Sequence, residues 1–201
     1  SQLIMDTQYK NYTRLMFVAH SQAELETYRK NTSSPGAILL VRRHGEPLWV
    51  GAAGQSNLEY QTPMRTNTPF RVGSITKMFV ATVVLQLTEE GKLGLEDRLA
   101  ERLPKVQGKI PSSAHIRIRH LLGHLSGIFD PPNERLNYQL EIVNNPGRID
   151  AMTTGELLET YVYGKKLHFE PGTGYSYSNT NYWLLGQIVE DVEQKPLQKV
   201  L

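Results

Sequence analysis

The stretch FRVGSITKMFVATVVLQLTEEG, residues 70–91, decides how the rest of the chain is interpreted. After Gly73 its apolar residues fall almost all around a helical wheel, which predicts a helix buried in the middle of a domain. Its first turn nevertheless carries a hydroxyl, Ser74, and an amine, Lys77, spaced so that they share one helix face. A lysine beside a buried helix is costly unless it is paired or its proton takes part in chemistry.

The composition excludes several classes of protein. The chain has 201 residues, 39% hydrophobic and 21% charged, which is typical of a globular protein. The net charge is +2 with acids and bases interleaved, so no basic stripe indicates a nucleic-acid partner. No apolar run approaches the roughly 18 residues of a membrane span, and the first residues lack the order of a signal peptide. The absence of cysteine excludes disulfides and thiol chemistry.

Before the central helix, the sequence predicts a helix and a β-hairpin. Residues 6–30 are rich in helix formers, whereas 36–43 and 46–54 have strand patterns joined at a turn, His44-Gly45. The first strand is apolar on both faces, which predicts cover on both sides. Residues 55–69 are expected to be a polar connection.

After the central helix, the chain predicts a mostly helical body. Gly91 is a suitable helix C-terminus, and Thr153 with Glu156 has capping-box spacing. The expected segments are a short helix within 95–104, an extended run and short helix over 116–128, a long loop over 129–150, a helix over 153–163 and a final amphipathic helix within 175–194.

Ser74-Ile75-Thr76-Lys77 is the only S-x-x-K sequence in the chain. A serine hydroxyl becomes a good nucleophile when a neighbouring base takes its proton, and a desolvated lysine can be that base. The backbone N–H groups of a first helical turn can stabilise the resulting oxyanion. The alternative is a surface serine near a surface lysine, because the pattern is short.

Tyr177-Ser178-Asn179 lies in a Gly/Ser/Asn-rich turn that leads into the final helix. A tyrosine hydroxyl beside a lysine can move a proton, and an asparagine amide can hold a substrate amide. The structural alternative is that Ser178 or Asn179 caps the helix, and the two roles are compatible.

Four blocks resemble, in order, the penicillin-binding serine hydrolases of the class C β-lactamase type. They are TPFRVGSITKMF, LQLTEEGKLGLEDRL, IRIRHLLGHLSGI and FEPGTGYSYSNTNYWLLGQIVE, within residues 35–195. D-Ala-D-Ala carboxypeptidases and D-specific peptidases are the most similar members, because the tyrosine motif is Y-S-N. The resemblance implies an α+β fold of the β-lactamase and penicillin-binding-protein type. In it, residues 1–66 would belong to the α/β domain and 67–201 would form a mostly helical domain.

The resemblance implies a role for each motif residue. Ser74 would be the acylated nucleophile, Lys77 its proton partner, Tyr177 the acid/base for the leaving group, and Asn179 a contact to the substrate amide and to Lys77. Such chemistry uses no cofactor, and whether Lys77 or Tyr177 takes the first proton stays open. Family members are extracytoplasmic, act on peptides ending in D-amino acids, and meet β-lactams as inhibitors or substrates.

The chain departs from the family pattern after Asn179. The family has a third motif, a cationic residue or histidine followed by Thr/Ser-Gly on a later strand, and no residue here supplies it. We therefore expect the chain to be the N-terminal part of the fold, as a fragment or as one half of a cleaved protein whose other half is a second chain. Its sheet would then lack the C-terminal strands, and the isolated chain need not be active.

Three alternatives to the carboxypeptidase or D-peptidase interpretation stay open. A class C-like β-lactamase or an esterase would use the same catalytic groups, whereas a sensor or other binding module would use none. His120 and His124 have the i, i+4 spacing of a zinc site, but the acid of H-E-x-x-H is absent, so no metal is predicted.

Overall fold

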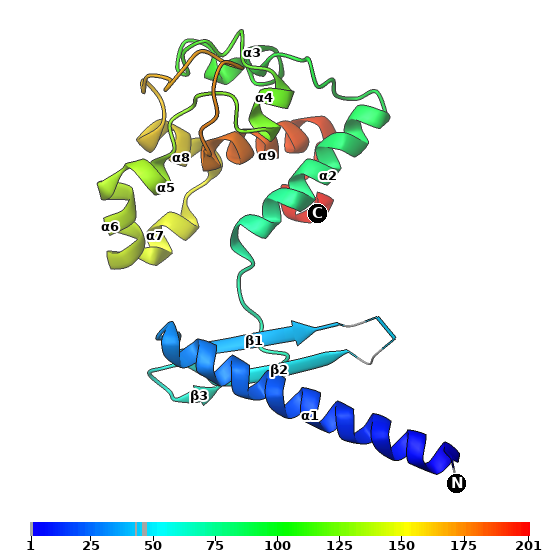
Figure 1. The fold of residues 1–201 in the computed structure, drawn as a ribbon. Coiled ribbons are helices and arrows are strands. Elements are labelled where there is room, and N and C mark those ends of the chain that lie inside the picture. The colour runs from blue at the N-terminus through cyan, green and yellow to red at the C-terminus, as the bar shows by residue number, and fades with distance from the viewer. Residues whose placement is uncertain (1, 43, 46–47) are drawn as a thin grey trace. The chain divides into compact units, whose positions relative to one another are not determined.

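The computed structural model describes residues 2–42, 44–45 and 48–201, without the side chains of 2–15 and 146. The chain forms two compact units, Ser1–Arg71 and Val72–Leu201 (Figure 1). None of the helices among the described residues has the length and hydropathy that crossing a membrane requires.

The first unit consists of one long helix on a small antiparallel sheet. Its elements are α1 (Gln2–Asn31), β1 (Gly36–Val41), β2 (Trp49–Asn57) and β3 (Thr62–Pro63), in the sheet order β1-β2-β3. α1 lies across one face of the hairpin (Figure 1) and is fixed there by a hydrogen bond from the Gln22 amide to the carbonyl of Ala52, at 3.1 Å. The predicted helix and hairpin are therefore present. The predicted strand ends at residues 43, 46 and 47 lie outside the described residues.

Two expectations for this unit are wrong. β2 continues to Asn57 and pairs with β3, so residues 55–69 are not simply a connection. β1 is not covered on both faces, because its residues are only partly buried and Leu40 is 58% exposed. A helix covers one face of this hairpin, and no second described layer of the unit covers the other.

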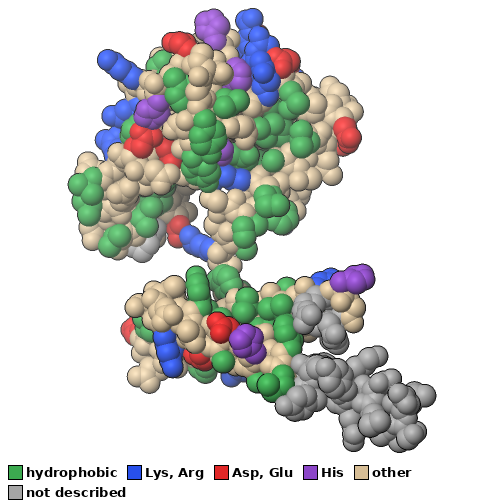
Figure 2. Space-filling view, in the orientation of Figure 1, with side chains coloured by type: hydrophobic (Ala, Val, Ile, Leu, Met, Phe, Trp, Pro, Cys, Tyr) green, Lys and Arg blue, Asp and Glu red, His purple; other side chains and the backbone are tan. Residues whose placement is uncertain are grey.

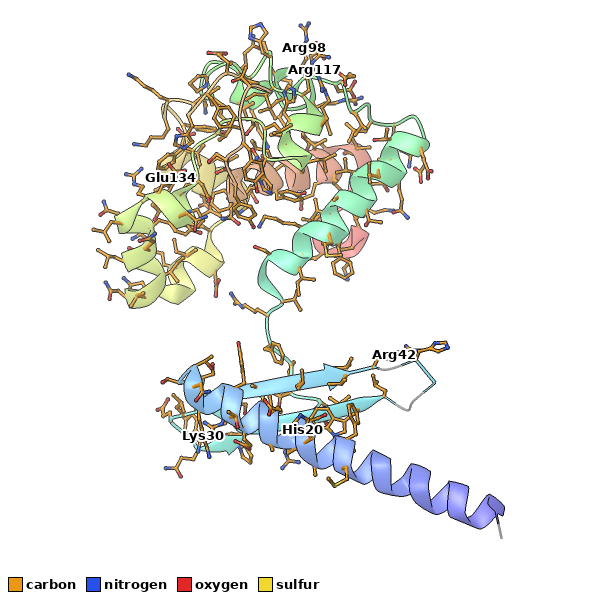
Figure 3. The ribbon with its side chains drawn as sticks, in the orientation of Figure 1. His20, Lys30, Arg42, Arg98, Arg117 and Glu134 are labelled. Carbon is orange, nitrogen blue, oxygen red and sulfur yellow. The ribbon has the colours of Figure 1, made fainter. Side chains whose placement is uncertain are left out.

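The second unit is helical. Its elements are η1 (Gly73–Ile75, a 3₁₀ turn), α2 (Thr76–Glu89), α3 (Leu99–Arg102), η2 (Pro104–Val106, a 3₁₀ turn), α4 (Ile118–Leu122), α5 (Pro131–Glu134), α6 (Leu136–Asn144), α7 (Pro146–Ala151), α8 (Thr154–Tyr161), α9 (Asn179–Glu193) and α10 (Leu197–Val200). An antiparallel bridge pairs Arg98 with Arg117, and these residues lie side by side in Figure 3. This bridge brings the starts of α3 and α4 together.

α9 is the central helix of this unit, and the prediction that α2 is buried on all sides is wrong. α9 contacts α2, α4, α5, α8 and α10, and from Leu184 to Val189 every residue is buried. α2 buries only one stripe, Val80, Val84 and Leu87. Other apolar side chains reach the surface, where Figure 2 shows hydrophobic side chains along the helix; these include Met78, Phe79 and Leu85, each at least 50% exposed.

The long loop predicted over 129–150 is instead three short helices, α5, α6 and α7. Pro131 and Pro146 are the first residues of α5 and α7. A proline is favourable there because the first N–H of a helix has no partner within the helix and the ring already has a helical φ. These prolines therefore begin helices rather than interrupt them.

Candidate active site

Ser74 lies in the 3₁₀ turn η1 immediately before α2, and Lys77 lies in the first turn of α2. Gly73 has a φ of 56°, a conformation that side chains with a Cβ rarely adopt. The turn exposes Ser74 to solvent and leaves Lys77 half-buried. The sequence GSITK thus places the hydroxyl at the surface and the amine just beneath it.

The structure brings the four predicted site residues into direct contact. The Ser74 Oγ lies 2.8 Å from the Tyr177 hydroxyl. The Lys77 Nζ donates to the Ser74 Oγ at 3.1 Å and to the Asn179 Oδ1 at 2.7 Å. Two short motifs about 100 residues apart therefore form one hydrogen-bonded cluster. The amine of Lys77 therefore has two oxygen acceptors, which offset the cost of placing a lysine beside a buried helix.

Tyr177 has a hydroxyl whose proton is easier to remove than that of an ordinary tyrosine. Burial on its own would raise its pKa, but hydrogen bonds to Lys77 and Ser74, together with the charge of Lys77, outweigh burial and hold the pKa below its usual value. The Lys77 Nζ is 5.1 Å from the centroid of the Tyr177 ring. A tyrosine in this setting is suited to accept and return a proton.

The ring of His124 packs against the ring of Tyr177. The two rings have centroids 4.3 Å apart, and the His124 Nδ1 accepts the Ser178 N–H at 3.2 Å. Burial, and next the charge of Lys77, lower the pKa of His124, so its imidazole is neutral at neutral pH. A neutral ring accepts the Ser178 hydrogen bond and adds no positive charge beside Lys77.

His120 and His124 do not share a helix face, because α4 ends at Leu122 and His124 has a φ of 58°. The His120 Nδ1 accepts the Arg117 N–H at 3.2 Å. Among the described residues, no group of three or more His, Cys, Asp or Glu side chains could hold a metal ion. The i, i+4 spacing in the sequence therefore does not correspond to a geometric pair.

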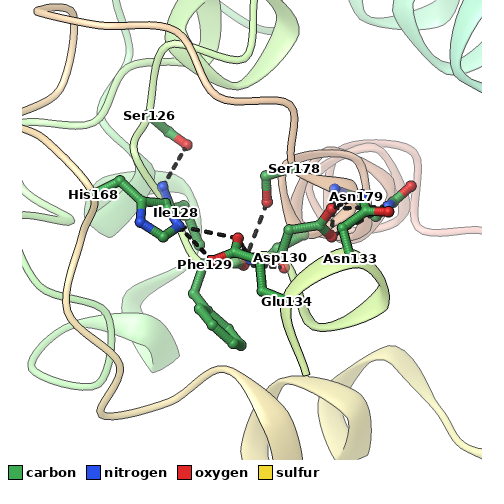
Figure 4. Close-up of polar contacts among 10 residues, drawn as sticks. Ser126, Ile128, Phe129, Asp130, Asn133, Glu134, His168, Ser178 and Asn179 are labelled. Atoms are coloured by element: carbon green, nitrogen blue, oxygen red, sulfur yellow. Dashed lines mark hydrogen bonds and ion pairs between the residues drawn. The ribbon is translucent and has the colours of Figure 1, made fainter. Parts of the chain in front are cut away.

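Asp130 belongs to this cluster, and the sequence did not indicate it. Its side chain is completely buried. The Oδ1 accepts the backbone N–H of Asn179 at 3.0 Å and its side-chain Nδ2 at 3.1 Å, and the Oδ2 lies 3.2 Å from the same Nδ2 (Figure 4). The Asn133 amide also donates to the Oδ2. A possible signal was the Asp-Pro pair, because aspartate before an N1 proline is typical of a helix start.

The expected capping of α9 by Ser178 or Asn179 is not what the structure has. Ser178 occupies the N-cap position without a side-chain cap bond, and its hydroxyl donates to the Phe129 carbonyl at 3.4 Å. Asp130 caps the helix instead, through the Asn179 N–H. A negative side chain is favourable at this end of a helix.

Further contacts hold the 126–134 segment beneath the site. The Ser126 hydroxyl donates to the Asn181 Oδ1 at 2.6 Å. The Glu134 Oε1 accepts the Asp130 N–H at 2.9 Å, and the His168 Nε2 lies 3.0 Å from the same Oε1 and 2.9 Å from the Oε2 (Figure 4). His168 therefore has a specific partner in Glu134.

A pocket of about 260 Å³ opens beside Lys77 and Asn179. Tyr182 and Trp183 of α9 line it, and both are only partly buried. Tyr138 is buried, with its ring centroid 5.0 Å from that of Tyr161. Its ring lies 6.2 Å from that of Trp183, so Tyr138 packs behind a residue that lines the pocket and does not line the pocket itself.

The fold and the cluster of Ser74, Lys77, Tyr177 and Asn179 can now be compared with known protein families. Residues 22–201 match the family described as Beta-lactamase, and the chain belongs to that family. The α+β fold of the β-lactamase and penicillin-binding-protein type predicted from the sequence is thereby confirmed.

Two solved structures and a curated protein show what the chain is similar to. It is 34% identical to a D-stereospecific amidohydrolase from Streptomyces sp., with a TM-score of 0.75 over 90% of this chain and 51% of that one. A penicillin-binding protein from Bacillus halodurans is 25% identical, with a TM-score of 0.71 over 87% of this chain and 52% of that one. Esterase EstB from Burkholderia gladioli is 33% identical over 81% of this chain and 42% of that protein.

The chain spans only part of its relatives. It covers 32% of protein flp from Staphylococcus aureus strain MRSA252, at 27% identity over 83% of this chain. It covers about half of the solved structures named above.

Proposed function

We propose that the protein is a serine hydrolase that works through an acyl-enzyme at Ser74. The observation that carries the proposal is the contact of the Ser74 Oγ with both the Tyr177 hydroxyl, at 2.8 Å, and the Lys77 Nζ, at 3.1 Å. A nucleophile within hydrogen-bond reach of a base, which is itself oriented by a third group, is the arrangement that nucleophilic catalysis requires.

The proposed reaction begins with attack of the Ser74 Oγ on the acyl carbon of the substrate. The hydroxyl proton passes to the Lys77–Tyr177 pair, and the oxyanion is stabilised by the Ser74 N–H at the start of the 3₁₀ turn. Tyr177 returns a proton to the leaving amine or alcohol, so that an ester to Ser74 and a free product remain. Water then attacks the ester carbon and delivers one proton to the same pair. The bond to the Ser74 Oγ breaks, the pair returns that proton to the Oγ, and the free acid leaves.

The proposed substrate is an amide or peptide whose acyl side comes from a D-amino acid. The likeness to the D-stereospecific amidohydrolase supports this class. In this proposal Asn179 contacts the substrate amide, as predicted from the sequence, and the adjoining pocket with Tyr182 and Trp183 receives the substrate side chain. A D-Ala-D-Ala carboxypeptidase is the narrower form of this proposal. An extracytoplasmic location is proposed with it, because the substrates of this class are cell-wall peptides.

Ester hydrolysis is the second candidate, and the 33% identity to esterase EstB is the observation that favours it. The leaving group of an ester is an alcohol, and its departure depends less on protonation than the departure of an amine does. Esterase activity would therefore depend less on Tyr177 than amidase activity does.

The full-length protein should be assayed with a D-alanyl-D-alanine peptide, a D-phenylalanine anilide, a p-nitrophenyl ester and a chromogenic cephalosporin. We expect kcat/KM to be highest on a D-substrate, with its L-enantiomer slower, and Ser74→Ala to abolish every activity. Turnover of only the ester would favour the second candidate. Turnover that persists in Ser74→Ala would contradict both.

A further inference from the structure

The Asn179 side-chain amide can face Lys77 in only one useful orientation. It has one oxygen acceptor and one NH₂ donor, and the Lys77 Nζ, a donor, lies 2.7 Å from the Oδ1. If the amide rotated by half a turn, its NH₂ would face the Lys77 ammonium. The site would then lose an acceptor and gain a repulsive contact. Something must therefore determine which end of the amide faces Lys77.

Asp130 is the group that sets this orientation. Its carboxylate is on the side of Asn179 opposite Lys77 and accepts the Nδ2 through both oxygens, at 3.1 and 3.2 Å. The rotated amide would direct its oxygen at this carboxylate. Asp130 also accepts the Asn179 backbone N–H, so both the backbone and the side chain of Asn179 are held by one buried group.

We propose that Asp130 is a positioning residue for the reaction of Ser74, acting through the Asn179 amide on Lys77. This inference rests on the proposed function, because it assigns Asp130 a role in the same reaction. The chain of contacts is Asp130 to Asn179, Asn179 to Lys77, and Lys77 to Ser74. Asp130 touches neither the nucleophile nor the acyl group.

The charge of Asp130 also acts on the proton-transfer pair. Burial and the Asp130 charge both raise the pKa of Tyr177, against the stronger lowering by Lys77 and Ser74. Replacing Asp130 with a neutral group would therefore lower the pKa of Tyr177 and favour its deprotonated form. The other titratable groups around Asp130 are His124, Glu134 and Tyr138, with His168 bound to Glu134.

The competing explanation is that Asp130 only stabilises the fold. A buried carboxylate at the start of the 15-residue helix α9 is favourable whatever the chemistry nearby. A purely structural role would lower the fraction of folded protein but would leave the pH dependence of the folded enzyme unchanged. The pH profile of acylation therefore separates the two explanations.

The test is the substitution Asp130→Asn in the full-length protein, with acylation by a p-nitrophenyl ester followed by stopped flow from pH 5 to 10. Loss of a hydrogen bond to a charged group is expected to slow acylation on the pH plateau by about 10- to 100-fold. The acid limb of the profile is expected to move to lower pH by about one unit. Circular dichroism confirms that the variant is folded.

Asn133→Ala is the matched control. Its amide also donates to the Asp130 carboxylate, but Asn133 is exposed and contacts neither Asn179 nor Lys77. Acylation within about twofold of wild type and an unchanged acid limb are expected. In a double-mutant cycle, Asp130→Asn is expected to add little to the loss caused by Asn179→Ala, because Asp130 acts through that amide.

An unchanged rate and acid limb in Asp130→Asn, a slower rate without a shifted limb, or full additivity with Asn179→Ala would each overturn the role of Asp130 while leaving the proposed function intact. A wild-type protein that is not acylated would overturn the proposed function and this role with it. If Asp130→Asn does not fold, Asn179→Ala decides: slow acylation supports the inference, and wild-type acylation overturns it.

Discussion

Lys77 connects two distant parts of the chain through a single amine. Its Nζ bonds Ser74 in its own helical turn and Asn179 at the start of α9. The Lys77 Nζ also lies over the Tyr182 ring, 5.6 Å from its centroid. The half-buried ammonium is therefore surrounded by oxygen acceptors and aromatic faces, which lowers the cost of removing it from water.

We expect Lys77→Ala to lower the rate of acylation by about 10² to 10⁴-fold, the range for losing a proton-transfer group. The fold should be retained, because Lys77 contributes no buried apolar surface to the core. The measurement is the acylation rate, with circular dichroism to confirm folding.

Lys109→Ala is the matched control for Lys77→Ala. Its Nζ also has an oxygen partner and a nearby ring, 3.1 Å from Glu159 and 4.8 Å from the centroid of the Tyr163 ring, but Lys109 is exposed and its partners lie outside the site. Acylation in this variant should equal that of wild type. Normal acylation in Lys77→Ala would rule out the role assigned to the lysine.

Buried histidines predict a loss of stability in mild acid. Burial is the main cause that lowers the pKa of His120 and of His124. In the unfolded chain a histidine has a pKa of about 6.5, so below that pH the unfolded state binds more protons than the folded state. Their contribution to stability is therefore complete above about pH 6.5 and is lost as the pH falls.

The check is urea denaturation of wild type, His120→Gln and His44→Gln at pH 7.5 and 5.5. The difference in the free energy of unfolding between the two pH values should be smaller in His120→Gln than in wild type. It should be unchanged in His44→Gln, because His44 is exposed. An equal loss in all three proteins would show that His120 is not responsible.

At the scale of elements, α8 begins with a capping box that the sequence predicted. The Thr153 Oγ1 accepts the Glu156 N–H at 3.2 Å, and the Glu156 carboxylate accepts the Thr153 N–H at 2.7 Å. Both partners are local, so their spacing in sequence was sufficient to find them.

Thr153→Ala should lower the free energy of unfolding by about 1 kcal/mol, the usual cost of losing an N-cap side chain. Thr160→Ala, at an exposed position in the same helix, should cost nothing because alanine favours a helix. Thermal or urea denaturation measures both. A Thr153→Ala protein as stable as Thr160→Ala would contradict the capping role.

Local signals explain what could be predicted from the sequence, and long-range packing explains what could not. The start of α8 at Thr154 and the hairpin followed from a capping box, strand periodicity and turn glycines, whereas Ser74, predicted in the first turn of the central helix, lies in the 3₁₀ turn before it. Asp130 was missed because its partner, Asn179, is far away in the sequence, and the neighbouring Asp-Pro pair indicates only the start of α5. The burial of α2 was overestimated because apolar composition cannot tell which side of a helix is covered.

At the scale of the molecule, the second unit has one continuous core. Its fully buried side chains come from elements spread over most of the unit, including Leu99 of α3, Leu121 of α4, Leu158 of α8 and Leu184 of α9. The site residues lie on elements that share this core, so the stability of the core keeps them in register.

Leu121→Ala should lower the free energy of unfolding by about 2–5 kcal/mol, because Leu121 is completely buried and a cavity would remain. Leu136→Ala is the control, since Leu136 is 67% exposed and should change stability little. Urea denaturation compares them. If Leu121→Ala and Leu136→Ala were equally stable, Leu121 would not be part of the core.

The central claim is that Ser74 becomes covalently acylated, and mass spectrometry of the full-length protein after incubation with a fluorescent penicillin tests it most directly. The account predicts one penicilloyl group per protein, carried by the peptide that contains Ser74 and absent from Ser74→Ala. An adduct on another residue, or no adduct with penicillin or with any of the assayed substrates, would contradict it.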